Sequence, residues 1–227
     1  MLQTKRVSRS LSRRLRDFGA VQPEGFDLSN VPTSDIAIHF ADGPPKLYQL
    51  TQWLPIFEAS LTDRTIVVVR QIETFQALQG ATSLPILLAP TYEDLMALYD
   101  RADFHAVMYV NNGFSNFQSL AFQQAVHIHL NHGESDKICM VSNQAKAYDK
   151  VFVAGPAAVR RHAAALIWFD ITHLARVGRP QLDLPVPNPL AEFAGTTITY
   201  APTWEGEDDA NNYTSVDVYG PSIISAA

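Results

Sequence analysis

The chain has 227 residues, of which 47% are hydrophobic, 10% aromatic and 18% charged. The charged fraction is below the roughly 25% usual in soluble domains, so the composition excludes a disordered chain and predicts a sizeable core. The single cysteine excludes a disulfide framework and a multi-cysteine zinc site, and no apolar run reaches the roughly 18 residues of a membrane-spanning helix.

The net charge of -6 is distributed unevenly along the chain. Residues 1–16 hold six basic residues and no acid, which leaves 11 basic and 23 acidic residues in the remainder. Apolar residues recur at helical spacing here, so residues 1–20 are predicted to be a basic amphipathic arm on an anionic membrane surface or, alternatively, a solvated arm. The acidic body argues against nucleic acid as a partner. The basic residues of the arm are Lys5, Arg6, Arg9, Arg13, Arg14 and Arg16.

From about residue 34, short apolar runs alternate with longer amphipathic stretches. This alternation predicts an α/β fold, with a Rossmann-like parallel sheet and helices on both faces. The expected strands are residues 35–40, 65–70, 84–88, 105–110, 125–130, 150–154 and 174–177. The expected helices are residues 47–61, 71–78, 92–101, 117–124 and 156–169. Pro55 conflicts with a continuous first helix, whereas Pro156 after Gly155 suits a first helical turn.

The composition changes after residue 180. Prolines at 185, 187 and 189 indicate a stiff linker over residues 181–195. A new strand is expected at residues 196–200, followed by an acidic loop at 205–209 and an apolar helix that starts near Pro221. The chain is therefore expected to contain one complete domain over residues 21–180 and the opening of a second over residues 196–227.

Histidines provide the densest chemistry in the sequence. The usual nucleotide-binding glycine motifs and the G-x-S-x-G elbow are missing. His127 and His129 point to one face of an expected strand, and we expect them to be hydrogen-bonded within a mostly buried strand. A metal site that includes these two residues is the alternative. His132 falls just past the carboxyl end of that strand, where open α/β sheets place ligands, so it is either a general base or part of a solvated loop.

Two further loops offer polar groups. Asn112 and Ser115 lie in a turn after another expected strand, where they are either turn residues or substrate contacts. Arg179, between Gly178 and Pro180, is either a packing residue at a hinge or an anion contact.

Three segments together resemble the CDP-glycerol glycerophosphotransferases, which build teichoic-acid-type polymers. Residues 132–137 (HGESDK) are similar to the family's His-Gly-x-x-x-Lys stretch, and residues 178–183 (GRPQLD) to its Gly-x-Pro-x-x-Asp segment. Residues 198–204 (ITYAPTW) resemble the Tyr-Ala-Pro-Thr-Trp start of its second domain. The resemblance covers roughly residues 105–227, and Asn131 replaces a tryptophan that often precedes the histidine in the family.

The resemblance implies that the chain is the first half of a glycosyltransferase-B-like two-domain fold. It implies that His132 deprotonates a hydroxyl of a lipid-linked polyol-phosphate acceptor, which attacks CDP-glycerol and releases CMP at the inner face of the cell membrane, on the cytoplasmic side. No metal is expected, and the alternatives are a related sugar-nucleotide glycosyltransferase or a non-catalytic binding module. From the resemblance and the loops together, the residues expected to contact substrate are Gly133, Ser135, Asp136, Lys137, Asn112, Ser115, Arg179, Thr203 and Trp204.

Overall fold

The computed structural model describes residues 31–135, 141–185, 187, 194–203, 212 and 214–226. The predicted basic arm, the acidic loop at 205–209, Asp136, Lys137 and Trp204 lie outside the described residues. The chain divides into two compact units, Met1–Pro185 and Val186–Ala227, and each is described here by itself.

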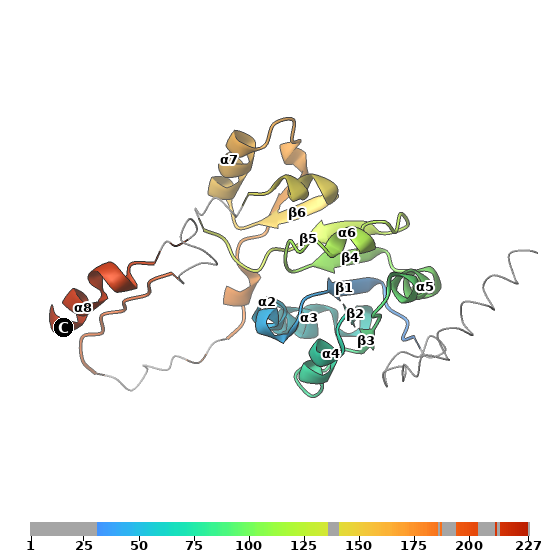
Figure 1. Ribbon diagram of the computed structural model, residues 1–227, viewed down its shortest axis with the longest axis horizontal. Coiled ribbons are helices and arrows are strands. Elements are labelled where there is room, and N and C mark those ends of the chain that lie inside the picture. The colour runs from blue at the N-terminus through green and yellow to red at the C-terminus, as the bar shows by residue number, and fades with distance from the viewer. Residues whose placement is uncertain are drawn as a thin grey trace, which may run out of the picture. The chain divides into compact units, whose positions relative to one another are not determined.

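The first unit is built on a parallel sheet (Figure 1). Among the described residues it has seven strands in the order β3-β2-β1-β4-β5-β6-β7, and every neighbouring pair runs parallel. This confirms the predicted Rossmann-like α/β fold. The strands are β1 (Ile36–Phe40), β2 (Thr65–Val69), β3 (Ile86–Leu88), β4 (Ala106–Tyr109), β5 (Val126–His129), β6 (Lys150–Val153) and β7 (Leu174–Arg176).

Both faces of the sheet are covered, as the apolar strands require. All five residues of β1 are buried, and because side chains alternate along a strand, Ile38 and Phe40 pack in one core while Ala37 packs in the other. The first core includes residues of α2, α3 and α4, and the second includes residues of α5 and α7. The helices of this unit are α2 (Tyr48–Thr51), α3 (Leu54–Leu61), α4 (Ile72–Leu78), α5 (Tyr92–Ala102), α6 (Asn116–Ser119) and α7 (Pro156–Ala165).

The predicted helix over residues 47–61 is wrong in its continuity. It is divided into α2 and α3, and Pro55 lies in the first turn of α3. Proline has no N–H to continue a helix and clashes with the preceding turn, so it starts the second segment instead. Short 3-10 turns complete the connections: η2 (Pro44–Lys46), η3 (Thr62–Arg64), η5 (Asn143–Ala147), η6 (Ile171–His173) and η7 (Pro180–Leu182).

Helix α5 begins with a capping box. The Thr91 hydroxyl accepts a hydrogen bond from the Asp94 backbone N–H at 3.1 Å, and the Asp94 carboxylate accepts one from the Thr91 backbone N–H at 3.1 Å. Two N–H groups that lack helical partners are thereby satisfied.

We expect Thr91→Ala to lower the free energy of unfolding by about 1 kcal/mol, because it removes the hydroxyl that caps α5. Urea denaturation followed by circular dichroism measures the change. Thr91→Ser keeps the hydroxyl and is the control. Equal losses in both variants would contradict the capping role.

In the second unit, the predicted strand over residues 196–200 is wrong. These residues are in irregular backbone, and the regular element described in this unit is α8 (Val216–Ala226), which contains Pro221. A strand needs a neighbour to accept and donate its backbone hydrogen bonds, and the described residues of this unit supply none. Tyr200 instead forms a hydrogen bond with Ser215, the residue before α8, and their hydroxyl oxygens are 2.8 Å apart.

Candidate functional site

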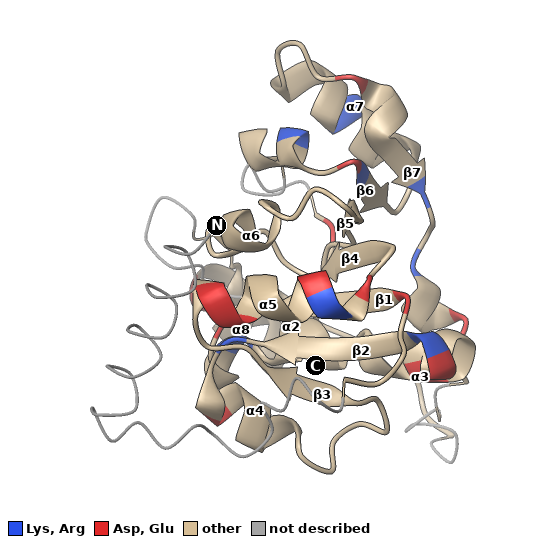
Figure 2. Cartoon of the chain, turned by 90° about the vertical axis from the view of Figure 1, so that its right-hand side faces the viewer, with Lys and Arg blue, Asp and Glu red and all other residues tan. Residues whose placement is uncertain are grey.

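The candidate site lies at the carboxyl edge of the sheet in the first unit. In a parallel sheet the carboxyl ends of all strands meet at one edge, and ligands of open α/β folds bind there. His132 follows β5, Gly155 follows β6 and Arg179 follows β7. Figure 2 shows basic residues at the end of β7 and in the segment after it.

A sharp turn at Asn131 sets the position of His132. Asn131 has a positive φ of 64°, a left-handed conformation that asparagine tolerates better than most residues. Its side-chain oxygen accepts a hydrogen bond from the His132 backbone N–H at 3.0 Å, and its carbonyl accepts one from the Trp53 indole at 2.7 Å. Two hydrogen bonds therefore fix the loop after β5, one from within the loop and one from Trp53, just before α3.

The imidazole of His132 is half-buried and lies against Tyr48. The two rings meet edge to face, with centroids 6.1 Å apart and planes at 88°. Burial lowers the pKa of His132, and the positive charges of Arg179 and Lys46 lower it further, while the Val110 backbone carbonyl acts in the opposite direction. The buried Nδ1 has no hydrogen-bond partner among the described residues. A neutral imidazole is suited to accept a proton at a ring nitrogen that a substrate hydroxyl can reach.

A hollow of about 670 Å³ adjoins the residues that follow His132. Glu134 supports its wall: one carboxylate oxygen accepts a hydrogen bond from the Ala154 backbone N–H at 2.8 Å, and the other lies 3.5 Å from an Arg161 guanidinium nitrogen. The loop after β5 is thereby joined to the residue that follows β6 and to the middle of α7. The hollow is lined by Gly133, Glu134, Ser135, residues 154–158, Arg161 and Arg179.

The structure brings some of the predicted site residues together. Gly133, Ser135 and Arg179 line the hollow, and His132 directly precedes them in the loop. A Cβ at Gly133 would stand 3.8 Å from the Arg179 guanidinium, which is an ordinary contact, so sterics alone do not require glycine there.

Other predicted residues lie elsewhere. Asn112 and Ser115 do not line the hollow: the Asn112 side-chain oxygen accepts a hydrogen bond from Tyr148 at 3.2 Å, and Ser115 is exposed before α6. Thr203 belongs to the second unit. Their contacts with substrate remain predictions.

His127 and His129 are buried, and they belong to the core of the sheet. The Phe122 carbonyl lies 2.7 Å from His127 Nε2, so this nitrogen donates, and Nδ1 accepts a hydrogen bond from the Tyr109 hydroxyl at 2.7 Å. His129 stacks on Tyr148 with ring centroids 5.0 Å apart. Its Nε2 has no partner among the described residues, so the expected hydrogen bonding of the pair is only partly met.

The metal alternative finds no support in the described part of the chain. There, no group of three histidine, cysteine, aspartate or glutamate side chains is placed to hold a metal ion.

Sequence reasoning missed the residues from distant segments that lie near His132 or contact its loop. Tyr48 and Lys46 come from the segment after β1, Trp53 immediately precedes α3, and Arg161, which pairs with Glu134, lies on α7. In the sequence, Tyr48 and Trp53 look like members of an amphipathic helix, because no local pattern marks a contact across some 80 residues.

The chain was compared with known protein families, curated sequences and solved structures. No protein-family model and no curated protein sequence matches the chain. A solved structure, Anabaena Alr3699/HepE in complex with UDP and glucose, superposes with a TM-score of 0.47 at 11% sequence identity. The match covers 64% of this chain and 44% of that protein, so it spans less than half of its length.

Proposed function

We propose that this chain supplies the acceptor side and the catalytic base of a transferase that uses a nucleotide-activated donor. The observation that carries the proposal is the environment of His132. Its imidazole lies at the carboxyl edge of the sheet with a lowered pKa, and Arg179 and Lys46 are close enough to contribute to that shift. A base that is neutral near pH 7, with cations beside it, suits deprotonation of a hydroxyl next to a phosphate.

The specific reaction we propose is glycerol phosphate transfer from CDP-glycerol. Its support is the order and content of the three sequence segments, residues 132–137, 178–183 and 198–204. His132 takes the proton of an acceptor hydroxyl, and the oxygen bonds to the β-phosphorus of CDP-glycerol. The bond from that phosphorus to the bridging oxygen breaks, and CMP leaves with the electron pair. Cations near the base would offset the phosphate charge.

The proposed acceptor is a polyol phosphate linked to a membrane lipid, reached from the cytoplasmic side. In this scheme residues 21–180 form the acceptor-side domain, residues 196–227 begin the donor domain, and the basic arm contacts the membrane surface. Within the part of the chain that the structure describes, no helix combines the length and the apolar character needed to cross a bilayer.

The test is nucleotide release by the full natural protein. We expect CMP release from CDP-glycerol only when a glycerol-phosphate oligomer is present, and little release from CDP-ribitol or UDP-glucose. Preference for UDP-glucose would replace this proposal with the related glycosyltransferase. Binding of an acceptor without nucleotide release from any donor would favour a non-catalytic module.

A further inference from the structure

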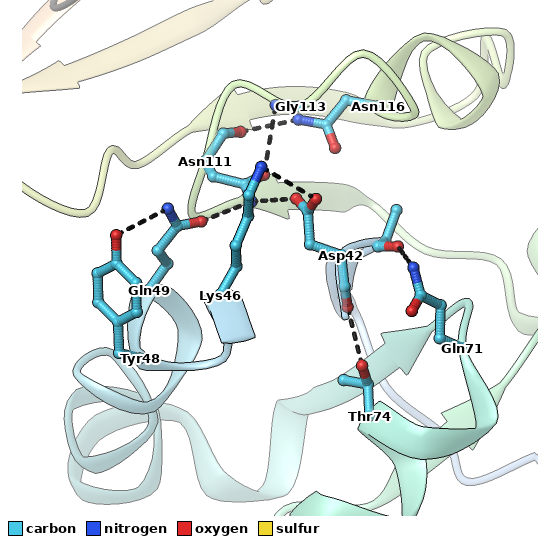
Figure 3. Close-up of polar contacts among 10 residues, drawn as sticks. Asp42, Lys46, Tyr48, Gln49, Gln71, Thr74, Asn111, Gly113 and Asn116 are labelled. Carbon is cyan, nitrogen blue, oxygen red and sulfur yellow. Dashed lines mark hydrogen bonds and ion pairs between the residues drawn. The ribbon is translucent and has the colours of Figure 1, made fainter. Parts of the chain in front are cut away.

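Tyr48 is an exposed tyrosine whose ring lies against the imidazole of His132. It is the first residue of α2, 58% of its surface is accessible, and its ring contacts the His132 imidazole edge to face. The direction in which its hydroxyl donates is decided by a chain of buried amides behind it (Figure 3).

The chain begins at Asp42, which follows β1. The Asp42 carboxylate can only accept hydrogen bonds, and it also pairs with Lys46 at 3.5 Å. Asn111, which follows β4 and is 5% exposed, donates to Asp42 through its amide nitrogen at 2.7 Å. The amide of Asn111 must therefore keep its NH₂ group toward Asp42.

Other contacts fix Asn111 in that orientation. Its side-chain oxygen accepts a hydrogen bond from the Gly113 backbone N–H at 3.4 Å. Its backbone carbonyl accepts one from the Asn116 side chain at 2.8 Å. An inverted amide would place its oxygen against the Asp42 carboxylate and its NH₂ group against the Gly113 N–H, so inversion is unfavourable.

The second N–H of Asn111 sets the orientation of Gln49. It donates to the Gln49 side-chain oxygen at 2.8 Å, so the Gln49 NH₂ group points away from Asn111. That group donates to the Tyr48 hydroxyl oxygen at 3.3 Å. Gln49 is 8% exposed, and rotating its amide would bring two NH₂ groups face to face.

The Tyr48 hydroxyl therefore accepts from inside the protein and keeps its own proton for another partner. No described residue accepts that proton. Because Gln49 occupies one side of the oxygen, the hydroxyl proton is left to point away from the buried amides.

We propose that Tyr48 is a ligand-binding residue, whose hydroxyl donates a hydrogen bond to a phosphate or hydroxyl oxygen of the molecule on which His132 acts. This inference rests on the proposed function, since it takes His132 as the base. Asn111 and Gln49 are positioning residues, and Asp42 sets the polarity of the relay.

The test measures binding of glycerol 3-phosphate to the purified protein, followed by the NMR shift of the His132 ring. Tyr48→Phe keeps the ring and removes the donor, and we expect about threefold to tenfold weaker binding, the range of one hydrogen bond. Gln49→Glu has nearly the same shape but replaces the NH₂ group with an oxygen. That oxygen would accept the Tyr48 proton and turn it inward.

Gln49→Glu should therefore weaken binding as much as Tyr48→Phe, and the double variant should be no weaker than either alone. Tyr92→Phe is the matched control, because Tyr92 is an exposed tyrosine at the first position of α5. Wild-type affinity in either Tyr48→Phe or Gln49→Glu would overturn the inference, as would absence of any shift of the His132 ring in the wild type. If the wild-type protein released no CMP from CDP-glycerol but Tyr48→Phe and Gln49→Glu still weakened glycerol 3-phosphate binding, only the proposed function would be contradicted.

Discussion

Replacing His132 with glutamine is expected to lower the turnover of the full natural protein by about 10²- to 10⁴-fold, because general base catalysis contributes rate factors of that size. Glutamine is polar and of similar size, but it cannot take up a proton. Affinity for the nucleotide donor should be unchanged, because His132 is proposed to act on the acceptor.

The pH profile separates this role from a structural one. The base works only when neutral, so the rate should rise with pH and level off once His132 loses its proton. Burial lowers the pKa of His132, so the rise should be centred below the ordinary value of about 6.5. His105→Gln is the control, since the His105 side chain is 73% exposed at the start of β4. Near-normal turnover in His132→Gln would refute the assignment.

The second large effect is a loss of stability in acid, caused by two buried histidines. Burial lowers the pKa of His39 on β1 and that of His129 on β5 to about 3 in each case. The charge of Arg70 lowers the pKa of His39 further. The charges of His132 and His162 likewise lower the pKa of His129. Both rings are therefore neutral in the folded protein through the whole range in which they titrate when unfolded.

The folded and unfolded states bind different numbers of protons, and this difference decides whether stability rises or falls with pH. Below about pH 6.5 the unfolded chain binds a proton at each histidine, whereas the folded chain binds none until about pH 3. Stability is therefore fully present above pH 6.5 and falls as the pH decreases. Each imidazole contributes a slope that approaches about 1.4 kcal/mol per pH unit, so the two together contribute about 3 kcal/mol per unit.

Urea denaturation between pH 7.5 and 4.5 measures this slope. His39→Gln and His129→Gln should each reduce the slope by the contribution of one imidazole, which approaches about 1.4 kcal/mol per pH unit. This reduction is expected even if either variant is less stable at pH 7.5. A slope that is the same in the wild type and in both variants would show that these buried rings are not the source of acid sensitivity.

The sequence was sufficient to predict the sheet because strands buried on both faces are continuously apolar. β1 and β2 were expected at residues 35–40 and 65–70 and are found at Ile36–Phe40 and Thr65–Val69. The strand expected at 196–200 failed because its apolar character is local, whereas a strand also needs a partner. Helix 47–61 failed at Pro55, where the backbone constraint outweighs the amphipathic pattern.

Only the part of the candidate site that follows β5 and β7 could be predicted from the sequence. His132 was expected just past the carboxyl end of a strand, whereas Arg179 was expected only as a hinge residue or an anion contact. The other side is formed by Tyr48, Gln49 and Asn111, whose roles depend on hydrogen bonds between segments about 60 residues apart. Polar residues in such positions are indistinguishable in sequence from ordinary turn and surface residues.

The hydrogen bond from the Trp53 indole to the Asn131 carbonyl has a consequence for the order of folding. It joins residues 78 positions apart, with four strands, β2 to β5, between them. Such a contact carries a large loop-closure entropy, so it becomes favourable only after the intervening strands have paired. The loop that presents His132 is therefore fixed late, and a ligand-competent His132 reports that β1, β4 and β5 have already assembled.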